Sequence, residues 1–399
     1  MPDAMRPAPL PTARTSLFDP PPRLRELRET APLSPLLYPD GSVGWLATTH
    51  ALSRAILADP RFSARQELKK MPVPAGIGDQ QRRPADPGMF IGMDAPEHTR
   101  LRRLYAGEFT ARRIRRLEAR VARITSGRLD AMRADRPPVD LVRSFALPIP
   151  SLTISEVLGV PPEHRDRFQR DATTAHALDS SPEEVAAAFD GVRRLLSGLV
   201  DAKRAHPADD LLSRLAASGG LSHEELVNSA LLLLFAGYET TANMIALGTF
   251  ALLCHPEQWA LLVHGPDRVG DAVEELLRYL SIVHLGLVRA ALEDVEIEGR
   301  LIRAGEVVTC SVPSVNRDPS VFGDAERLDI TRTPGRHMAF GHGVHQCLGA
   351  HLARVEMRAA LGGLAGRFPG LRLAVPADEV PMRAEMAFYG VHRLPVTWD

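Results

Sequence analysis

The sequence predicts a mainly α protein with a minor β region, folded as one domain over residues 1–399 with a proline-rich N-terminal extension over residues 1–22. Helical periodicity of apolar residues dominates the chain, while strand patterns gather in two places. Hydrophobic residues make up 45% of the sequence, which is enough for a substantial core. The chain has no internal repeat and no low-complexity tract, so we expect one fold rather than separable domains.

Helices are expected wherever apolar residues recur at every third or fourth position. The expected helices span residues 23–30, 50–57, 96–107, 111–133, 150–158, 182–204, 222–254 and 268–280, and another follows residue 347 and runs from 349 to 361. The helix over 222–254 is apolar on every face between residues 230 and 236, which predicts that it runs through the interior.

Strands are expected on both sides of a glycine turn at Gly299 and near the C-terminus. The expected strands span residues 295–298, 301–310, 371–375 and 391–397. Two other segments, 72–89 and 315–337, lack any period. The first is long and bears glycine and proline, so we expect a functional loop rather than a simple connector.

The composition excludes several function classes. A formal charge of −1 gives no bulk attraction to nucleic acid or to acidic membranes. Three cysteines without paired spacing indicate a reducing compartment, and Cys254 and Cys310 lie in apolar patterns typical of the core. The N-terminus lacks the apolar segment of a secretion signal, and the longest apolar run falls far short of the ~20 residues that span a bilayer. We expect a cytoplasmic monomer that contacts neither membrane nor nucleic acid.

Cys347 lies in the most informative segment, Phe-Gly-His-Gly-Val-His-Gln-Cys-Leu-Gly over residues 340–349. A thiolate just before a helix meets unpaired N–H groups and the positive end of the helix dipole. Gly341 and Gly343 permit positive φ and close approach of a flat ligand. Such a thiolate can bind haem iron. The alternative is an inert buried cysteine, which the glycine density and the two neighbouring histidines disfavour.

This segment resembles the cysteine-ligand loop of the cytochrome P-450 family, because Phe340, Gly343, Cys347 and Gly349 match that loop without a gap. The resemblance implies the cytochrome P-450 fold, with haem b (iron protoporphyrin IX) between the long central helix and the helix that follows the cysteine loop. Cys347 is then the axial ligand of the haem iron.

The central helix carries a second unusual feature, Ala-Gly-Tyr-Glu-Thr-Thr over residues 236–241. Glycine inside a helix costs about 1 kcal/mol relative to alanine, and buried polar groups cost more unless they are paired. One interpretation is a polar patch where the helix reaches the surface. The other is a locally opened helix in which Thr240 is free to bond oxygen or water.

The same run is similar to the oxygen-binding motif of the cytochrome P-450 family, Ala/Gly-Gly-x-Asp/Glu-Thr. By that match Thr240 stabilises bound oxygen and positions the water that delivers protons. Glu239 relays protons from solvent, and Gly237 opens space above the iron. Thr240 and Glu239 are therefore the expected catalytic residues.

Glu275 and Arg278 stand three residues apart and share one helix face, where they can pair. Pairs at this spacing are common on surfaces and contribute little. The family, however, has Glu-x-x-Arg here and a second arginine before the cysteine loop, which Arg332 matches. The resemblance implies a structural lock that supports the cysteine loop.

Cations are needed to meet the two haem propionates. His98 and Arg102 lie one helical turn apart on the same face. A lone histidine or arginine is more often a solvated or structural side chain. The family places propionate partners at these two positions and at Arg289 and His345, and arginine binds carboxylates bidentately. His337 is a further candidate.

Electrons are expected from another protein, because no glycine-rich phosphate loop follows a strand to form a flavin or nucleotide domain. The likeness to bacterial members of the family implies a ferredoxin and a ferredoxin reductase. Four arginines form a basic stretch that is either a solvated helix face or part of a docking patch for an acidic iron–sulfur protein: Arg112, Arg113, Arg115 and Arg116.

The resemblance runs from His98 to Gly349 and implies a monooxygenase. Its substrate is expected to be a bulky hydrophobic small molecule, a secondary metabolite such as a polyketide, macrolide or terpenoid-like compound, that is hydroxylated or epoxidised with O2. The expected pocket segments are mainly apolar and span 71–90, 176–178, 234, 236, 285–288 and 386–388. Two alternatives remain: a peroxide-driven haem peroxygenase, which does not need Thr240, and a non-enzymatic haem-binding sensor, which has no use for Glu239 and Thr240.

Overall fold

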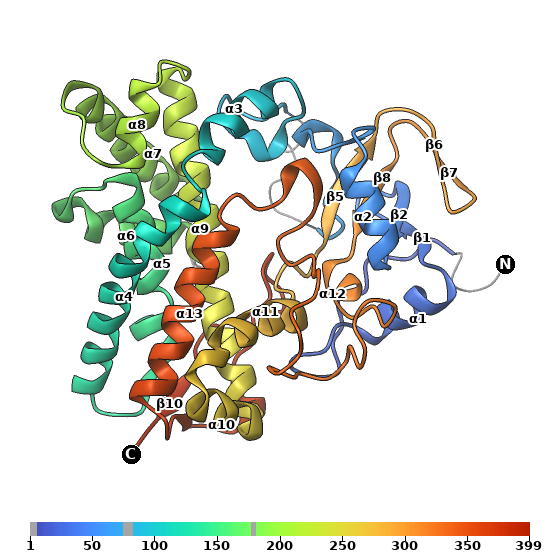
Figure 1. Cartoon of the computed structure of the whole chain (residues 1–399). Coiled ribbons are helices and arrows are strands. Elements are labelled where there is room, and N and C mark those ends of the chain that lie inside the picture. The colour runs from blue at the N-terminus through green and yellow to red at the C-terminus, as the bar shows by residue number, and fades with distance from the viewer. Residues whose placement is uncertain (1–5, 75–82, 177–180) are drawn as a thin grey trace.

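The computed structural model describes residues 6–74, 83–176 and 181–399. A helical body holds most of the chain, and a smaller sheet region with the N-terminal helices lies beside it (Figure 1). The predicted class, mainly α with a minor β region, is confirmed. The helices are α1 (Pro22–Thr30), α2 (His50–Ala58), α3 (Glu97–Ala106), α4 (Ala111–Ala134), α5 (Pro148–Leu158), α6 (Pro162–His176), α7 (Pro182–Ala205), α8 (Leu211–Ala217), α9 (His223–Cys254), α10 (Pro256–His264), α11 (Val269–Leu280), α12 (Val312–Val315) and α13 (Ala350–Arg367).

Four of these helices were not predicted: α6, α8, α10 and α12. The segment that forms α6 is rich in charged residues and shows no clear apolar stripe, while α8 and α12 are too short for a period to register. Helix α10 starts at Pro256, directly after α9 ends at Cys254. Proline fits the first turn of a helix, where its missing N–H leaves no bond unmade.

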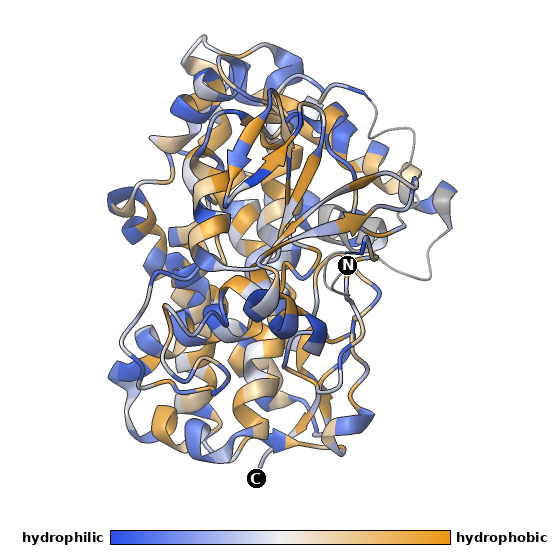
Figure 2. Ribbon diagram, turned by 90° about the vertical axis from the view of Figure 1, so that its right-hand side faces the viewer, coloured by the Kyte–Doolittle hydropathy of each residue, from blue (hydrophilic) through white to orange (hydrophobic). Residues whose placement is uncertain are grey.

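The main sheet has five strands in the order β1-β2-β8-β5-β3, namely Leu33–Leu37, Val43–Ala47, Val307–Cys310, Leu287–Ala291 and Phe62–Ser63. Its strands are largely apolar (Figure 2). The expected hairpin over 295–310 is wrong in its second half. Only β6 (Val295–Ile297) and β7 (Arg300–Ile302) pair with each other, and after a turn at Gly305 the chain enters the main sheet as β8.

Strands β1 and β2 were missed, because β1 contains Pro35, β2 contains Gly44, and both are short. The C-terminal strands are shorter than expected. They form a separate sheet in the order β4-β10-β9, which spans Val139–Asp140, Pro395–Thr397 and Arg372–Leu373.

Helix α9 passes through the core and packs against α5, α7 and α13. Within the described ranges it is the one helix long and apolar enough to cross a membrane, but 72% of its most apolar window is buried inside the fold. Its length is therefore explained by packing, as expected for an interior helix.

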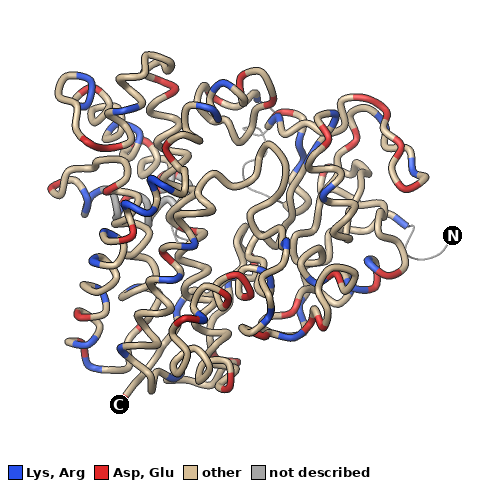
Figure 3. The backbone as a smooth tube through the Cα atoms, viewed as in Figure 1, with Lys and Arg blue, Asp and Glu red and all other residues tan. Residues whose placement is uncertain are grey.

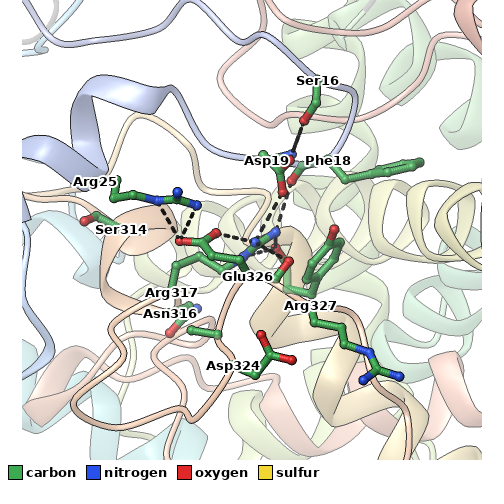
Figure 4. Close-up of polar contacts among 12 residues, drawn as sticks. Ser16, Phe18, Asp19, Arg25, Ser314, Asn316, Arg317, Asp324, Glu326 and Arg327 are labelled. Carbon is green, nitrogen blue, oxygen red and sulfur yellow. Dashed lines mark hydrogen bonds and ion pairs between the residues drawn. The ribbon is translucent and has the colours of Figure 1, made fainter.

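The N-terminal segment before α1 packs on the core. Ala8 bridges to Leu36 of β1, and the Phe18 ring meets Phe250 of α9 edge-on with 5.1 Å between centroids. Arg317, only 1% exposed, binds Asp19 and Glu326 and stacks over the Tyr279 ring (Figure 4). This arginine ties the N-terminal segment to the irregular region after α12.

The expected lock below the cysteine loop is present. Arg278 and Glu275 of α11, each with 2% of the side chain exposed, form two parallel bonds of 2.7 and 2.8 Å. Arg332 adds a contact to Glu275 at 3.2 Å, and Arg278 also donates to the carbonyl oxygens of Asn316 and Ala325. The lock therefore fixes the irregular segment that leads to the cysteine loop.

Candidate active site

The cysteine loop turns sharply into α13. Gly341 and Gly343 adopt positive φ, 69° and 76°, which glycine permits at no steric cost. A Cβ on Gly343 would lie 2.2 Å from the carbonyl oxygen of Leu57. Only glycine at this position therefore lets the loop approach the end of α2 so closely. The Cys347 N–H donates to the Phe340 carbonyl oxygen at 2.9 Å and closes the loop.

The Cys347 side chain is exposed, yet burial raises the pKa of its thiol. These two facts agree if the sulfur lies at the floor of a hollow. The N–H groups of Gly349 and Ala350 lower that pKa, as predicted for a helix start, and Arg102 and Arg354 act in the same direction. Without a bound metal, the effect of burial on the pKa is larger than the combined effect of these groups. Coordination of a metal would therefore be needed to stabilise the thiolate.

Helix α9 presents a partly exposed face near its middle, although it is otherwise buried. Ala236 is exposed, while Gly237 and Thr240 are half-buried. These positions, one and four residues apart, share one side of the helix. Because α9 packs beside α13, this face and the Cys347 sulfur can border the same hollow.

The expected local opening of α9 is not present. The helix is continuous from His223 to Cys254, and the Thr240 hydroxyl donates to the Ala236 carbonyl oxygen at 2.7 Å. A hydrogen bond of this kind, from a threonine hydroxyl to the carbonyl oxygen four residues earlier, satisfies the hydroxyl without interrupting the helix. Gly237 also differs from expectation, because an added Cβ would make ordinary contact with Ile154 of α5. The small side chain that faces open space is Ala236.

Glu239 is buried and pairs with Arg383 from the C-terminal segment. Arg383 also donates to the Asn243 side-chain oxygen at 3.1 Å. Sequence reasoning missed Arg383, because a single arginine in an irregular segment carries no signal. A proton that passes through Glu239 must therefore exchange with this ion pair.

Glu356 is a second acid beside the threonine pair, and it too was missed. Burial in α13 raises the pKa of this carboxyl to about 8, against the nearby hydroxyls of Thr153 and Thr241. The group is therefore mostly protonated at neutral pH. The one available signal is its position on an apolar face of the helix after the cysteine loop.

The structure brings together all four predicted propionate partners, from α3, β5 and the short turn Gly343–His345. The rings of His98 and His345 lie 4.0 Å apart between centroids. His98 is buried, and its Nε2 has no hydrogen-bond partner within the described ranges. Arg289 is buried, and Arg102 donates to the Gln346 carbonyl oxygen at the cysteine loop.

The positive charge of the cluster comes from Arg289, Arg102 and Lys69, while its two histidines are held neutral. Burial first, then Arg289 and His98, lowers the pKa of His345 to about 3. Lys69 belongs to the same group, because burial and Arg289 lower its pKa to about 8, and no sequence pattern marks it. Asp94 is a carboxylate that acts on these groups in the opposite direction. The closely spaced cations Arg289 and Arg102, together with the unpaired His98 imidazole, suit two propionate groups.

Other predicted residues lie elsewhere. His337 bonds Glu274 at 3.1 Å and does not join the propionate cluster. Leu234 is fully buried in the core and cannot line an open pocket. Parts of two expected pocket segments, residues 75–82 and 177–178, lie outside the described residues, while 285–288 is half-buried as a pocket wall would be.

A cysteine sulfur at a helix start, a partly exposed alanine–threonine face and a cluster of cations beside the cysteine loop fit a haem-thiolate protein. A family model described as Cytochrome P450 matches residues 269–386. Cytochrome P450 105C1 from a Streptomyces species is 48% identical over 388 residues, which cover 97% of each chain. The chain belongs to the cytochrome P450 family, and that membership makes it an enzyme with a haem-iron cofactor.

Solved structures agree with this assignment. CYP105P1 in complex with filipin I is 42% identical with a TM-score of 0.90, over 99% of each chain. The LnmA cytochrome P450 hydroxylase from the leinamycin biosynthetic pathway of Streptomyces atroolivaceus is also 42% identical, with a TM-score of 0.87 over 97% of this chain and 98% of that one. The cytochrome P-450 fold expected from the cysteine loop is confirmed.

Proposed function

We propose that this cytochrome P450 hydroxylates or epoxidises a bulky hydrophobic secondary metabolite such as a polyketide or macrolide in the cytoplasm. O2 is the oxidant, and electrons come from a ferredoxin and its reductase. The observation that carries the proposal is that α13, which begins just after the exposed Cys347, packs against α9, which bears the partly exposed face around Thr240. A haem-binding sensor would need the cysteine ligand but not the exposed face around Thr240.

The residues fit haem b. Cys347 would supply the sulfur ligand of the iron, and the cation cluster would hold the propionates through Arg289, Arg102, His98 and His345. Bound haem supplies the chemistry that activates O2 for insertion into a C–H or C=C bond. The protein contributes orientation, exclusion of water and protons.

Protons would arrive along α9. The Thr240 hydroxyl donates to Ala236, so its oxygen remains available to accept a bond from a water in the hollow. Glu239 would exchange protons with solvent when its ion pair with Arg383 opens. Glu356 is a reserve of one proton near Thr241.

Substrate would be held by apolar surface. Leu287 and Val288 of β5 and Leu285 just before it are half-buried, and Phe388 is half-buried in the C-terminal segment. Such walls suit a large, mainly hydrophobic ligand. The related structures with filipin I and from the leinamycin pathway support a secondary metabolite as the ligand class.

The redox partner would dock near the cysteine loop. Val344 in that loop is 69% exposed, and Arg112, Arg115 and Arg116 at the start of α4 are exposed. Figure 3 shows basic segments along this helix, with acidic segments among them. Arg113 is neutralised by Glu108. An acidic iron–sulfur protein would be steered to such a surface by its charge.

The test is a panel of polyketide, macrolide and terpenoid compounds, screened for a substrate-induced shift of the haem spectrum. Compounds that shift it are then incubated with O2, a bacterial ferredoxin and its reductase. We expect hydroxylated or epoxidised products. Faster turnover with hydrogen peroxide alone would favour the peroxygenase alternative, and no shift with any compound would count against the substrate class.

A further inference from the structure

Arg354 of α13 forms an unusually well-defined ion pair with Glu274 of α11. Its Nε and Nη2 atoms lie 2.6 and 2.8 Å from the two carboxylate oxygens, and its Nη1 donates to the Ala350 carbonyl oxygen at 3.3 Å. His337 bonds the same carboxylate at 3.1 Å. The guanidinium plane is therefore fixed from both sides, as bidentate arginine–carboxylate geometry requires.

The fixed guanidinium lies over the Phe340 ring, 4.6 Å from its centroid. Phe340 begins the cysteine loop, and its carbonyl oxygen accepts the Cys347 N–H at 2.9 Å. A cation over an aromatic face is attractive, more so when it is shielded from water. A short chain of contacts thus connects α11, through Arg354 and Phe340, to the residue that carries the sulfur.

The pair also places charge near the sulfur. The Arg354 guanidinium stands over Phe340, whose carbonyl oxygen accepts the Cys347 N–H. Although burial acts to raise it, the bonds from Arg354 and His337 lower the pKa of Glu274 to about 2. Glu274 is therefore ionised at working pH, and the pair consists of two opposite full charges, with the cation stacked on the loop.

We propose that Arg354 is a positioning residue that holds the cysteine loop through Phe340 and sets the electron donation of Cys347 by its positive charge, which Glu274 partly offsets. This inference rests on the proposed haem-thiolate function. Charges beside a metal ligand tune the metal. A positive charge favours the reduced iron, so loss of Arg354 lowers the reduction potential and loss of the Glu274 charge raises it.

The experiment measures the midpoint potential of the haem iron and the ferrous carbon monoxide spectrum in holoenzyme variants: Arg354→Gln, Arg354→Lys, Glu274→Gln and the double variant Arg354→Gln/Glu274→Gln. The matched control is Arg367→Gln, because Arg367 lies on the same helix and pairs with Asp130 at 2.6 Å, away from the loop. Spectra are normalised to bound haem.

We expect the potential to fall in Arg354→Gln, to rise in Glu274→Gln and to return toward wild type in the double variant, with Arg354→Lys and Arg367→Gln close to wild type. Shifts of the same sign in the two single glutamine variants, or none, would overturn the inference. If Arg354→Gln does not fold, a rise in Glu274→Gln with no change in Arg354→Lys still supports it, and no rise in Glu274→Gln overturns it.

The two proposals fail differently. A wild-type protein without a thiolate-type carbon monoxide band would refute the haem-thiolate function and this inference with it. A wild-type protein with that band, whose variants lack opposite shifts, would refute the role of Arg354 alone.

Discussion

Two acids flank the threonine pair of α9 in different states. Glu239 is ion-paired with Arg383, while Glu356 is held mostly protonated by burial. The hydroxyl of Thr240 lies on the partly exposed face of α9. Glu239 can therefore exchange protons with solvent, while Glu356 keeps its proton in the core.

Replacement of Thr240 by alanine tests the proton route. We expect haem and substrate binding to persist, because the helix keeps its backbone bonds. Product formed per electron should fall at least about 10-fold, which is less than the effect that general acid–base groups typically have on rate. The measurement compares product and hydrogen peroxide with reductant consumed. Thr249→Ala is the control, since that hydroxyl makes the same back-bond to Ile245 away from the exposed face. Unchanged coupling in Thr240→Ala would refute the role.

Glu356 predicts a pH dependence of stability. Its folded pKa, about 8, lies above the ordinary value of 4.5, so the folded state binds the extra proton. The associated stability is complete below about pH 4.5 and is lost as pH rises through 8. Glu356→Gln should remove this loss and raise the free energy of unfolding above pH 8 by on the order of 4 kcal/mol.

Chemical denaturation at pH 5, 7 and 8.5 measures the effect. The exposed residue Glu379 supplies the control, because Glu379→Gln should leave the pH dependence as it is in wild type. Parallel pH profiles for wild type and Glu356→Gln would contradict the assignment.

The residues that could be predicted share a property. Cys347, Glu239 and Thr240 lie in contiguous motifs whose spacing is itself unusual. Arg383 and Lys69 act through contacts between segments far apart in the chain, and no local pattern marks them. The state of Thr240 was misjudged because back-bonding to the helix, invisible in a sequence, satisfies its hydroxyl.

At the scale of elements, long helices with a clear apolar period were predictable, and α9 was placed correctly in the interior. Short strands were not. Strands β1 and β2 acquire their register only in the sheet, where β2 pairs in parallel with β8 from the far end of the chain. The turn at Gly305 sends β8 into that sheet, which the local alternation of residues 295–310 could not reveal.

The lock between α11 and the irregular segment predicts a large stability effect. Arg278→Met leaves the Glu275 carboxylate buried without its main partner, which typically costs about 3–5 kcal/mol. The control is Arg23→Met, because Arg23 and Glu26 form an exposed pair at the same spacing. That change should stay within about 1 kcal/mol. Equal losses in urea denaturation of the two variants would contradict the role of the lock.

At the scale of the molecule, the helical body, the sheet region and the cysteine loop all contribute to the cation cluster. Arg102 and His98 come from α3, Arg289 comes from β5, and the cysteine loop contributes His345. The N-terminal segment joins the two regions through Phe18 and Asp19 (Figure 4). A group held by this cluster would therefore contribute to the stability of the whole fold.

The docking patch predicts salt-sensitive electron delivery. Arg115→Glu/Arg116→Glu should weaken ferredoxin-supported turnover about 10-fold at low salt, with a smaller difference at high salt, because exposed charges are screened. Peroxide-driven turnover should not change. The control, Arg123→Glu/Arg133→Glu, alters the same net charge farther along α4 at exposed positions. Equal losses in both double variants would show that net charge, rather than this patch, steers the partner.

The central claim is that the Cys347 thiolate ligates haem iron. The most direct measurement is the carbon monoxide difference spectrum of the reduced protein, recorded for wild type and for Cys347→Ser. We predict the band of thiolate-ligated haem in wild type and its loss in the serine variant. A colourless wild-type protein, or a serine variant with the same band, would contradict the account.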